Sequence, residues 1–326
     1  EVQGNVVIYH LIQRLKNMDI CGEIILVPNC NPIGTNIKAG EYTLGRFDPV
    51  NGTNWNRGYF FDKEAVEHFA KTVTREESIE GIKQRFRAHL SNAIDNKLAE
   101  PWGLGLAQQL NLKLQQMAVN ADFVLDLHNG PVSTRHVYIP EYAKDSAKLF
   151  NIPHCIFIPN VFAGALDEAT FCPWWTLQES IKTNLAREVS FNVEAFTLEM
   201  GSQEVIDFNE GNIDATSILS YLNAKGVLHE CDIKPTEMKR LGVYLKDYKT
   251  LFTNWGGMVE YMAKPGQTVK KGEPLAQILN IDDLDTDNGS RTLEAPCDLI
   301  PILHFPSASV LSGTQLYKVF TNYKEL

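Results

Sequence analysis

Two short runs of ionisable residues could carry chemistry, and each follows an apolar stretch. The first run contains Asp126 and His128 directly after Ala121–Leu125, and the second contains Glu199 within Phe196–Gly201. Both stretches have the composition of buried strands, and the end of such a strand is a place where side chains meet a ligand. Side chains on a strand alternate with period two, so Asp126 and His128 are predicted to point the same way. A carboxylate beside an imidazole is typical of a metal ligand and the group that orients it.

Glu199 is predicted to be buried, because Phe196, Leu198 and Met200 flank it. A structural ion pair is the simplest explanation for a carboxylate on a strand, and the chain has 40 acidic residues to supply such cases. A buried carboxylate without a partner is costly, however, and such groups concentrate at functional sites. Beside a metal, Glu199 could act as a general base.

Further candidates lie in residues 29–62, a stretch rich in Asn, Gly and Pro without clear periodicity. So long an irregular stretch within a compact domain is usually functional or disordered, and Arg46, Asn56 and Arg57 favour a functional loop. The guanidinium of Arg57 could bind a carboxylate through two parallel hydrogen bonds, a geometry that lysine cannot match. Arg46 could stabilise a developing oxyanion. Arg135 is a weaker candidate for a substrate contact and is predicted to be a surface arginine.

The order of six residues resembles the succinylglutamate desuccinylase/aspartoacylase family, relatives of the zinc carboxypeptidases: Glu1, Arg46, Asn56, Arg57, His128 and Glu199. The resemblance extends over essentially the whole chain. It implies one zinc ion per chain, with Glu1 and His128 among its ligands and Asp126 behind the imidazole. The family's first ligand is a His three residues before the Glu of its His-x-x-Glu pair, which would place it before Glu1. The chain also begins without Met, so we expect a truncated N-terminus.

The resemblance also implies an activity, the hydrolysis of the amide bond of a small anionic N-acyl amino acid. In that reaction Asn56 and Arg57 would grip the substrate carboxylate, Arg46 would polarise the scissile carbonyl, and Glu199 would transfer the proton. One alternative is a zinc carboxypeptidase, which shares the core and the Asn-Arg pair. The other is a catalytically inactive binding or sensing protein, which would gain support if the natural chain began near Glu1.

The order of predicted elements indicates an α/β fold. Helical spacing of apolar residues predicts helices around residues 7–15, 76–98, 104–119 and 215–228. Short apolar runs predict strands at residues 23–27, 122–127, 136–140, 155–158 and 193–199. Strands that alternate with helices predict a mixed or mainly parallel sheet flanked by helices on both faces, which the resemblance makes a zinc-carboxypeptidase-like fold.

The composition changes near residue 242, which predicts a catalytic domain of residues 1–241 and a module of residues 242–326. Short β-type runs and turns in residues 256–278 resemble half of a biotinyl/lipoyl-type β-sandwich, and a weaker copy follows. Lys270 and Lys271 lie in the wrong turn to carry biotin or lipoate. We therefore expect a small all-β sandwich without a prosthetic group, which would narrow the entrance to the site against peptides.

Charge and composition exclude some partners. The net charge is −10 and no Lys/Arg-rich run occurs, which argues against nucleic acid or an anionic membrane as partner. No apolar segment approaches the roughly 20 residues that span a bilayer. The six scattered cysteines lack C-x-x-C spacing and predict reduced, mostly buried thiols in a cytoplasmic protein. A homo-oligomer is left open.

Overall fold

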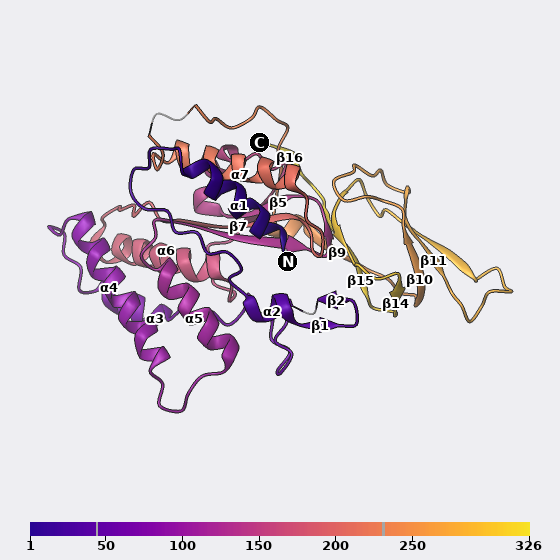
Figure 1. Cartoon of the computed structure of the whole chain (residues 1–326), viewed down its shortest axis with the longest axis horizontal. Coiled ribbons are helices and arrows are strands. Elements are labelled where there is room, and N and C mark those ends of the chain that lie inside the picture. Colours follow the sequence, from indigo (N-terminus) through magenta and orange to yellow (C-terminus); the bar gives the residue numbers. More distant parts are fainter. Residues whose placement is uncertain (44, 230–231) are drawn as a thin grey trace.

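The computed structural model describes residues 1–43, 45–229 and 232–326. A central sheet with helices on both sides forms the body of the molecule, and the C-terminal strands form an elongated module at one end, drawn in yellow (Figure 1). The N-terminus lies near the centre of the molecule rather than at its edge (Figure 1). The first residues of the chain are therefore available to a central site.

The central sheet has the strand order β16-β8-β6-β5-β7-β3. Its strands are β3 (Phe123–Gly130), β5 (His136–Pro140), β6 (His154–Ile158), β7 (Glu194–Ser202), β8 (Leu241–Tyr244) and β16 (Lys324–Glu325). The pairs β3/β7, β5/β6 and β6/β8 are parallel, whereas β5/β7 and β8/β16 are antiparallel. The four strands predicted between residues 122 and 199 are confirmed, and the sheet is mixed.

Helices lie on both sides of this sheet. They are α1 (Gln3–Leu15), α2 (Pro32–Asn36), α3 (Lys63–Ala70), α4 (Ile79–Leu98), α5 (Leu106–Ala118), α6 (Leu166–Leu185) and α7 (Phe208–Ala224), with the 3-10 turns η1 (Glu141–Leu149) and η2 (Leu245–Asp247). Side-chain oxygens of Asp62, Ser78 and Asp207 cap α3, α4 and α7. These caps satisfy backbone N–H groups that the first turn of a helix leaves unpaired.

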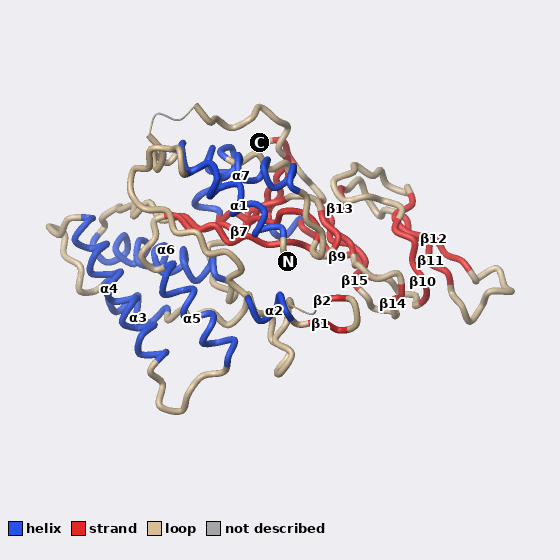
Figure 2. Tube along the Cα trace, viewed as in Figure 1, coloured by secondary structure: helices blue, strands red, loops and turns tan. Residues whose placement is uncertain are grey.

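The alternation of side chains along the strands gives the sheet two faces. One face carries Phe196, Leu198 and Met200 of β7 and packs against α1 and α7. The other face carries Ala195 and is covered by α6 and by the C-terminal strands. In Figure 2, α1 and α7 lie on one side of the red strands and α6 lies on the other. Thr197 and Glu199, which alternate with the first set, point to the second face.

Several elements differ from the sequence-based prediction. Residues 23–27, all of them described by the structure, form no strand, because Ile24 and Leu26 pack against the core without pairing to the sheet. Helix α7 begins at Phe208 rather than near residue 215. Helices α3 and α6 were not predicted. Residues 169–174 of α6 are all buried, since α6 contacts the sheet as well as α3 and α5, and so they show no amphipathic pattern.

The described cysteines are free thiols. Cys155 and Cys172 are buried as predicted, but Cys21 and Cys30 are exposed, so the prediction of mostly buried thiols is wrong for this pair. Their exposure follows from their position in the irregular segment after α1. Cys231 lies outside the described residues.

The C-terminal module is all antiparallel and consists of two four-stranded sheets, β12-β11-β10-β14 and β4-β13-β15-β9. Their strands are β4 (Val132–Ser133), β9 (Tyr248–Phe252), β10 (Gly257–Tyr261), β11 (Pro274–Leu279), β12 (Ser290–Glu294), β13 (Ile300–His304), β14 (Ser309–Val310) and β15 (Gln315–Phe320). Residues of both sheets form one apolar core, with Val259, Ile278 and Leu316 among them.

Two connections tie this module to the central sheet. Strand β4, which follows β3 directly, pairs with β13 of the module. Strand β8 begins at Leu241, where the domain boundary is expected, and pairs with β6 of the central sheet. A further small sheet, β1 (Lys38–Ala39) with β2 (Tyr42–Thr43), lies in the loop region after α2. None of the described helices is both long enough and apolar enough to cross a membrane.

Candidate active site

Six polar or ionisable residues lie together on the second face of the central sheet. They are Asp126 and His128 of β3, Thr197 and Glu199 of β7, and His136 and Tyr138 of β5. In the strand register, His128 lies opposite Glu199, which in turn lies opposite His136. Residues directly opposite each other in a sheet have side chains on the same face. The register therefore gathers these side chains at one place.

The His128 imidazole lies between two carboxylates. Its Nδ1 is 2.7 Å from Oε2 of Glu1, and its Nε2 is 2.8 Å from Oδ2 of Asp126. The Asp126 side chain is only 10 % exposed, whereas that of Glu1 is 22 % exposed. The Glu1 carboxylate and Nδ1 of His128 thus lie side by side, while Asp126 holds the ring through the opposite nitrogen, Nε2. A carboxylate in that position orients a metal-binding imidazole.

The electrostatics of this cluster favour positive charge between the two carboxylates. Burial opposes a charge on His128, but Asp126 and Glu1 hold its pKa well above the ordinary range. Burial also works to raise the pKa of Glu1, yet the His128 ring and Arg46 lower it to about 2. An opposite charge within a few ångströms is the usual cause of such shifts. A proton on the ring holds the two carboxylates together, and a cation could do the same.

The carboxylate of Glu199 lies on the same face of the sheet as His128, on the neighbouring strand β7. Its Oε2 is buried and has no hydrogen-bond partner among the described residues. Burial raises the pKa of Glu199 to about 7, against the influence of His128 and with that of Glu1. A carboxyl group that titrates near neutral pH and has a free oxygen can accept and release a proton.

The donor set fits part of a zinc site. Within the described ranges, no group of three or more His, Cys, Asp or Glu side chains could hold a metal ion. Glu1 and His128 supply two donors of types that Zn²⁺ accepts, and a catalytic zinc site has three protein ligands. The convergence of these two donors and the unpaired oxygen of Glu199 nearby both fit a bound cation.

A hairpin of residues 46–55 brings Arg46 next to Asn56. The N–H of Trp55 donates to the carbonyl oxygen of Arg46 at 3.3 Å. At the turn, the side chain of Asp48 accepts a hydrogen bond from the N–H of Val50 at 2.9 Å. The long separation between Arg46 and Asn56 in the sequence is therefore closed by backbone pairing.

Helices α5 and α6 hold the Asn56-Arg57 pair. The N–H of Leu166 donates to Oδ1 of Asn56 at 3.1 Å, which leaves Nδ2 facing the site, 3.0 Å from Nε2 of His128. Asn111 of α5 donates to the carbonyl oxygen of Arg57 at 2.8 Å. The Arg57 side chain is exposed, and in the described part of the chain it forms no ion pair with a carboxylate. It is therefore available to an anionic ligand.

Sequence reasoning missed four residues near the site: Tyr138, Asp167, Tyr248 and Lys318. Asp167, in the first turn of α6, is 2 % exposed. Burial and the charge of Asp126 raise its pKa to about 7. Tyr248 and Lys318 reach the site from the C-terminal module. From the sequence alone, Lys318 would be expected to face solvent, and only the packing of the C-terminal module against the central sheet shows that it lies near the site.

Two neighbouring residues have structural partners instead. Arg135 forms ion pairs with Glu210 at 3.3 Å and with Asp214 at 3.1 Å, which directs it toward α7. Burial lowers the pKa of His136 to about 3, and its Nδ1 lies 2.9 Å from the carbonyl oxygen of Thr134. His136 is therefore neutral.

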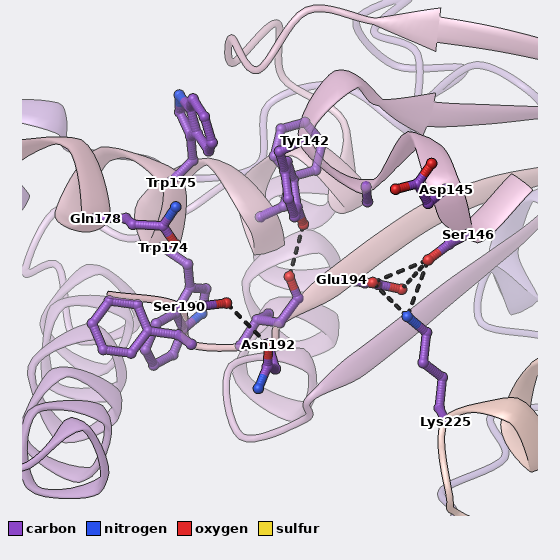
Figure 3. Close-up of a pocket in the computed structure, with 14 residues that line it drawn as sticks. Tyr142, Asp145, Ser146, Trp174, Trp175, Gln178, Ser190, Asn192, Glu194 and Lys225 are labelled. Atoms are coloured by element: carbon purple, nitrogen blue, oxygen red, sulfur yellow. Dashed lines mark hydrogen bonds and ion pairs between the residues drawn. The ribbon is translucent and has the colours of Figure 1, made fainter. Parts of the chain in front are cut away.

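A cavity of about 550 Å³ opens at the other end of β7, beside Glu194 (Figure 3). The Glu194 carboxylate accepts hydrogen bonds from Ser146 at 3.0 Å and from Tyr221 at 2.8 Å, and it pairs with Lys225 at 2.6 Å. These donors all belong to the protein, so Glu194 offers no free oxygen to a ligand. The catalytic candidates lie at the opposite end of the strand.

Comparisons with known proteins agree with this geometry. Residues 1–224 match the family profile described as the succinylglutamate desuccinylase/aspartoacylase catalytic domain. A solved structure from Shewanella frigidimarina NCIMB 400, assigned to succinylglutamate desuccinylase/aspartoacylase, is 45% identical with a TM-score of 0.94, and the match covers 100% of this chain and 87% of that one. A family protein from Shewanella amazonensis SB2B has the same identity and TM-score, with 100% and 88% coverage.

A more distant structure shares the fold. The succinylglutamate desuccinylase/aspartoacylase of Rhodobacter sphaeroides is 16% identical with a TM-score of 0.63, and the match covers 100% of this chain and 82% of that one. Among curated protein sequences, none matches this chain significantly.

Proposed function

The chain belongs to the succinylglutamate desuccinylase/aspartoacylase family, and from this membership we propose that it hydrolyses the amide bond of a small N-acyl amino acid with one zinc ion. Glu1 and His128 would hold the metal together with a His three residues before Glu1. The substrate would be an anion, which the exposed guanidinium of Arg57 can bind.

The main support for this proposal is the placement of Glu1 and Asp126 on the two sides of the His128 imidazole. Oε2 of Glu1 lies 2.7 Å from Nδ1 of His128, and Oδ2 of Asp126 lies 2.8 Å from Nε2 on the other side of the ring. Glu199 lies opposite His128 in the strand register, with an unpaired and buried oxygen. The residues proposed as metal ligand, orienting carboxylate and proton acceptor therefore occupy adjacent positions on one face.

Each residue of the site has a place in amide hydrolysis. Zinc bound to these donors would supply a Lewis acid that lowers the pKa of water. Glu199 takes the proton of the attacking water and delivers it to the leaving amine, and a pKa of about 7 suits both steps. Arg46 stabilises the negative charge that develops on the carbonyl oxygen. Asn56 and Arg57 hold the carboxylate of the substrate in place.

The first test is to read the coding sequence upstream of Glu1, because a His codon three positions earlier would supply the third ligand. The second is to measure hydrolysis of N-acyl amino acids by the full-length gene product with zinc and with a chelator. Zinc-dependent release of the free amino acid is the expected result. Release of C-terminal residues from oligopeptides would favour the carboxypeptidase instead. Ligand binding without turnover would favour the inactive binding protein.

A further inference from the structure

Three buried polar atoms on the second face of the central sheet have no hydrogen-bond partner among the described residues. They are Oε2 of Glu199, Nε2 of His136 and the hydroxyl oxygen of Tyr248. Folded proteins pair nearly all such atoms with a protein group or with ordered water, because an unpaired buried polar group is costly. Three of them in one region therefore indicate a partner that they share.

The three side chains lie close together. Glu199 of β7 and His136 of β5 are directly opposite each other, a position in which the Cβ atoms are about 4.5–5.5 Å apart. Tyr248 is the first residue of β9 in the C-terminal module, and its ring centroid lies 6.4 Å from that of His136. Burial raises the pKa of the Tyr248 hydroxyl, and the neighbouring Tyr138 and the charge of Glu199 raise it further. The hydroxyl is therefore near the carboxylate as well as near the imidazole.

The hydrogen-bonding capacity of these atoms fits one water molecule. Nδ1 of His136 lies 2.9 Å from the carbonyl oxygen of Thr134, which can only accept, so Nδ1 carries the hydrogen and Nε2 is an acceptor. Oε2 of an ionised Glu199 also accepts, whereas the Tyr248 hydroxyl can donate. The two acceptors cannot bond to each other. A water molecule can donate one hydrogen to each of them and accept the hydrogen of the hydroxyl.

We infer that His136 and Tyr248 hold one buried water molecule and that these two residues position the carboxylate of Glu199 through it. The inference rests on the proposed function, in which Glu199 is the general base. The buried water binds Oε2, and the other oxygen of the carboxylate is left for the water that attacks the amide. A reacting group held in one orientation does not have to be ordered during the reaction. Through Tyr248, the C-terminal module acts on the general base.

Four variants separate the hydrogen bonds from packing. Tyr248→Phe removes the donor and keeps the ring, which lies 5.7 Å from the ring of Phe320. His136→Asn can keep a donor near the position of Nδ1 but has no acceptor at Nε2, whereas His136→Gln can place its amide oxygen there. Tyr317→Phe is the matched control, because the Tyr317 hydroxyl donates to the carbonyl oxygen of Leu275 at 2.6 Å, inside the module.

Urea unfolding of the metal-free protein tests the water without any assay of activity. Removing a hydroxyl that has no partner at all should leave the urea midpoint unchanged or raise it, because a buried unpaired group is lost. Removing one that donates to a bound water should lower the midpoint. We expect Tyr248→Phe to lower it, and an unchanged or higher midpoint would overturn the inference.

Steady-state kinetics with zinc tests the positioning. Tyr248→Phe and His136→Asn should each lower kcat by about threefold to tenfold, the range that one neutral hydrogen bond supplies, with KM and zinc content unchanged. His136→Gln should retain most of the turnover, and Tyr317→Phe should not change kcat. Equal kcat values for the wild type, Tyr248→Phe and His136→Asn would overturn the inference, and so would equal losses in His136→Asn and His136→Gln.

A double-mutant cycle separates positioning from a general structural effect. If Tyr248 acts only through Glu199, then Tyr248→Phe should not lower kcat further in the Glu199→Gln protein. The same loss in both backgrounds would show that Tyr248 supports the fold instead, and the inference would be overturned.

The inference and the proposed function can fail separately. If no N-acyl amino acid is hydrolysed in the presence of zinc, the proposed function fails, and the water is then tested by crystallography. A crystal structure of the wild type should show one water about 2.6–3.2 Å from each of the three atoms, and Tyr248→Phe should weaken or remove it. Direct pairing of the Tyr248 hydroxyl with Tyr138, without a water between Glu199 and His136, would overturn the inference whatever the activity.

Discussion

Strand β7 carries two largely buried glutamates with opposite surroundings. Glu194 begins the strand, and Glu199 follows about 16 Å farther along it. The oxygens of Glu194 are bound by Ser146, Tyr221 and Lys225, whereas Oε2 of Glu199 has no partner in the described residues. A satisfied carboxylate stabilises a fold, and an unsatisfied one is kept for another purpose. The difference separates a structural acid from the proposed general base within a single strand.

The largest expected effect comes from removing the metal site that would explain why Glu199 is unpaired. If Glu199 is unpaired because it serves a metal site, His128→Ala should abolish both metal binding and turnover, since a catalytic zinc has only three protein ligands. The full-length protein should contain about one zinc per chain by metal analysis, and the variant should contain none. The Glu194→Gln variant is the control and should keep its zinc. Unchanged zinc in His128→Ala would show that the metal, if present, is held elsewhere.

Exchanging each glutamate for glutamine tests the comparison directly. Glu199→Gln removes the proton acceptor, so kcat should fall by on the order of a hundredfold or more with zinc content unchanged. Glu194→Gln should leave kcat close to that of the wild type, because its partners are all internal. Steady-state kinetics on the best substrate checks both. Near-full turnover in Glu199→Gln would remove this residue from the mechanism.

Strand β7 and its neighbours in the sheet could be predicted from the sequence because their apolar runs are short and bounded. The period of two along a strand predicts that Asp126 and His128 point the same way. In the structure, Oδ2 of Asp126 lies 2.8 Å from Nε2 of His128. Helix α6 could not be predicted in the same way, because it is buried on several sides and its apolar residues show no stripe. The run at residues 23–27 looked like a strand, yet its apolar side chains are buried by packing alone.

The parts of the site that escaped prediction depend on contacts between distant segments. Arg46 and Asn56 are separated in sequence, and only the pairing of the 46–55 hairpin brings them together. In the sequence, Asp167 resembles an ordinary charged residue at the start of a helix. Its burial follows only from the packing of α6 against the central sheet. Lys318 lies at the site because β4 pairs with β13. Local patterns predict the strands and the common direction of Asp126 and His128, whereas the positions of the surrounding charges depend on the tertiary structure.

Stability should respond to the two glutamates with opposite signs. The pKa of Glu199 is raised from 4.5 to about 7, so the folded protein binds this proton more tightly than the unfolded chain. The resulting stabilisation is complete below about pH 4.5 and is lost as the pH rises through 7. At pH 8, with metal removed by a chelator, Glu199→Gln should therefore be more stable than the wild type by up to about 3 kcal/mol.

Glu194→Gln should instead lose about 1–3 kcal/mol at neutral pH, because it weakens hydrogen bonds to a charged, partly buried partner. Urea unfolding of both variants at pH 5 and pH 8 measures the two effects in one experiment. The advantage of Glu199→Gln should disappear near pH 5. If Glu199→Gln is less stable than the wild type at pH 8, then Oε2 of Glu199 has a hydrogen-bond partner from the protein in solution. The proposed difference between Glu194 and Glu199 would then be wrong.

The last expected effect concerns the cations near the two ends of β7. Lys225 is paired with Glu194 inside the protein, whereas Arg57 has no carboxylate partner among the described residues. If Arg57 awaits the carboxylate of the substrate, replacing that carboxylate by a primary amide removes a charge-assisted contact worth roughly 1.5–3 kcal/mol. N-acyl amino acids should then be hydrolysed faster than their amides, and Arg57→Ala should erase most of the preference. Because acid and amide are compared within one preparation, zinc loss or partial unfolding affects both equally. Equal kcat/KM for acid and amide in the wild type would show that this loop recognises a group other than a carboxylate. The Glu199 end of β7 would then have no anion-binding position, and this difference from the Glu194 end would be lost.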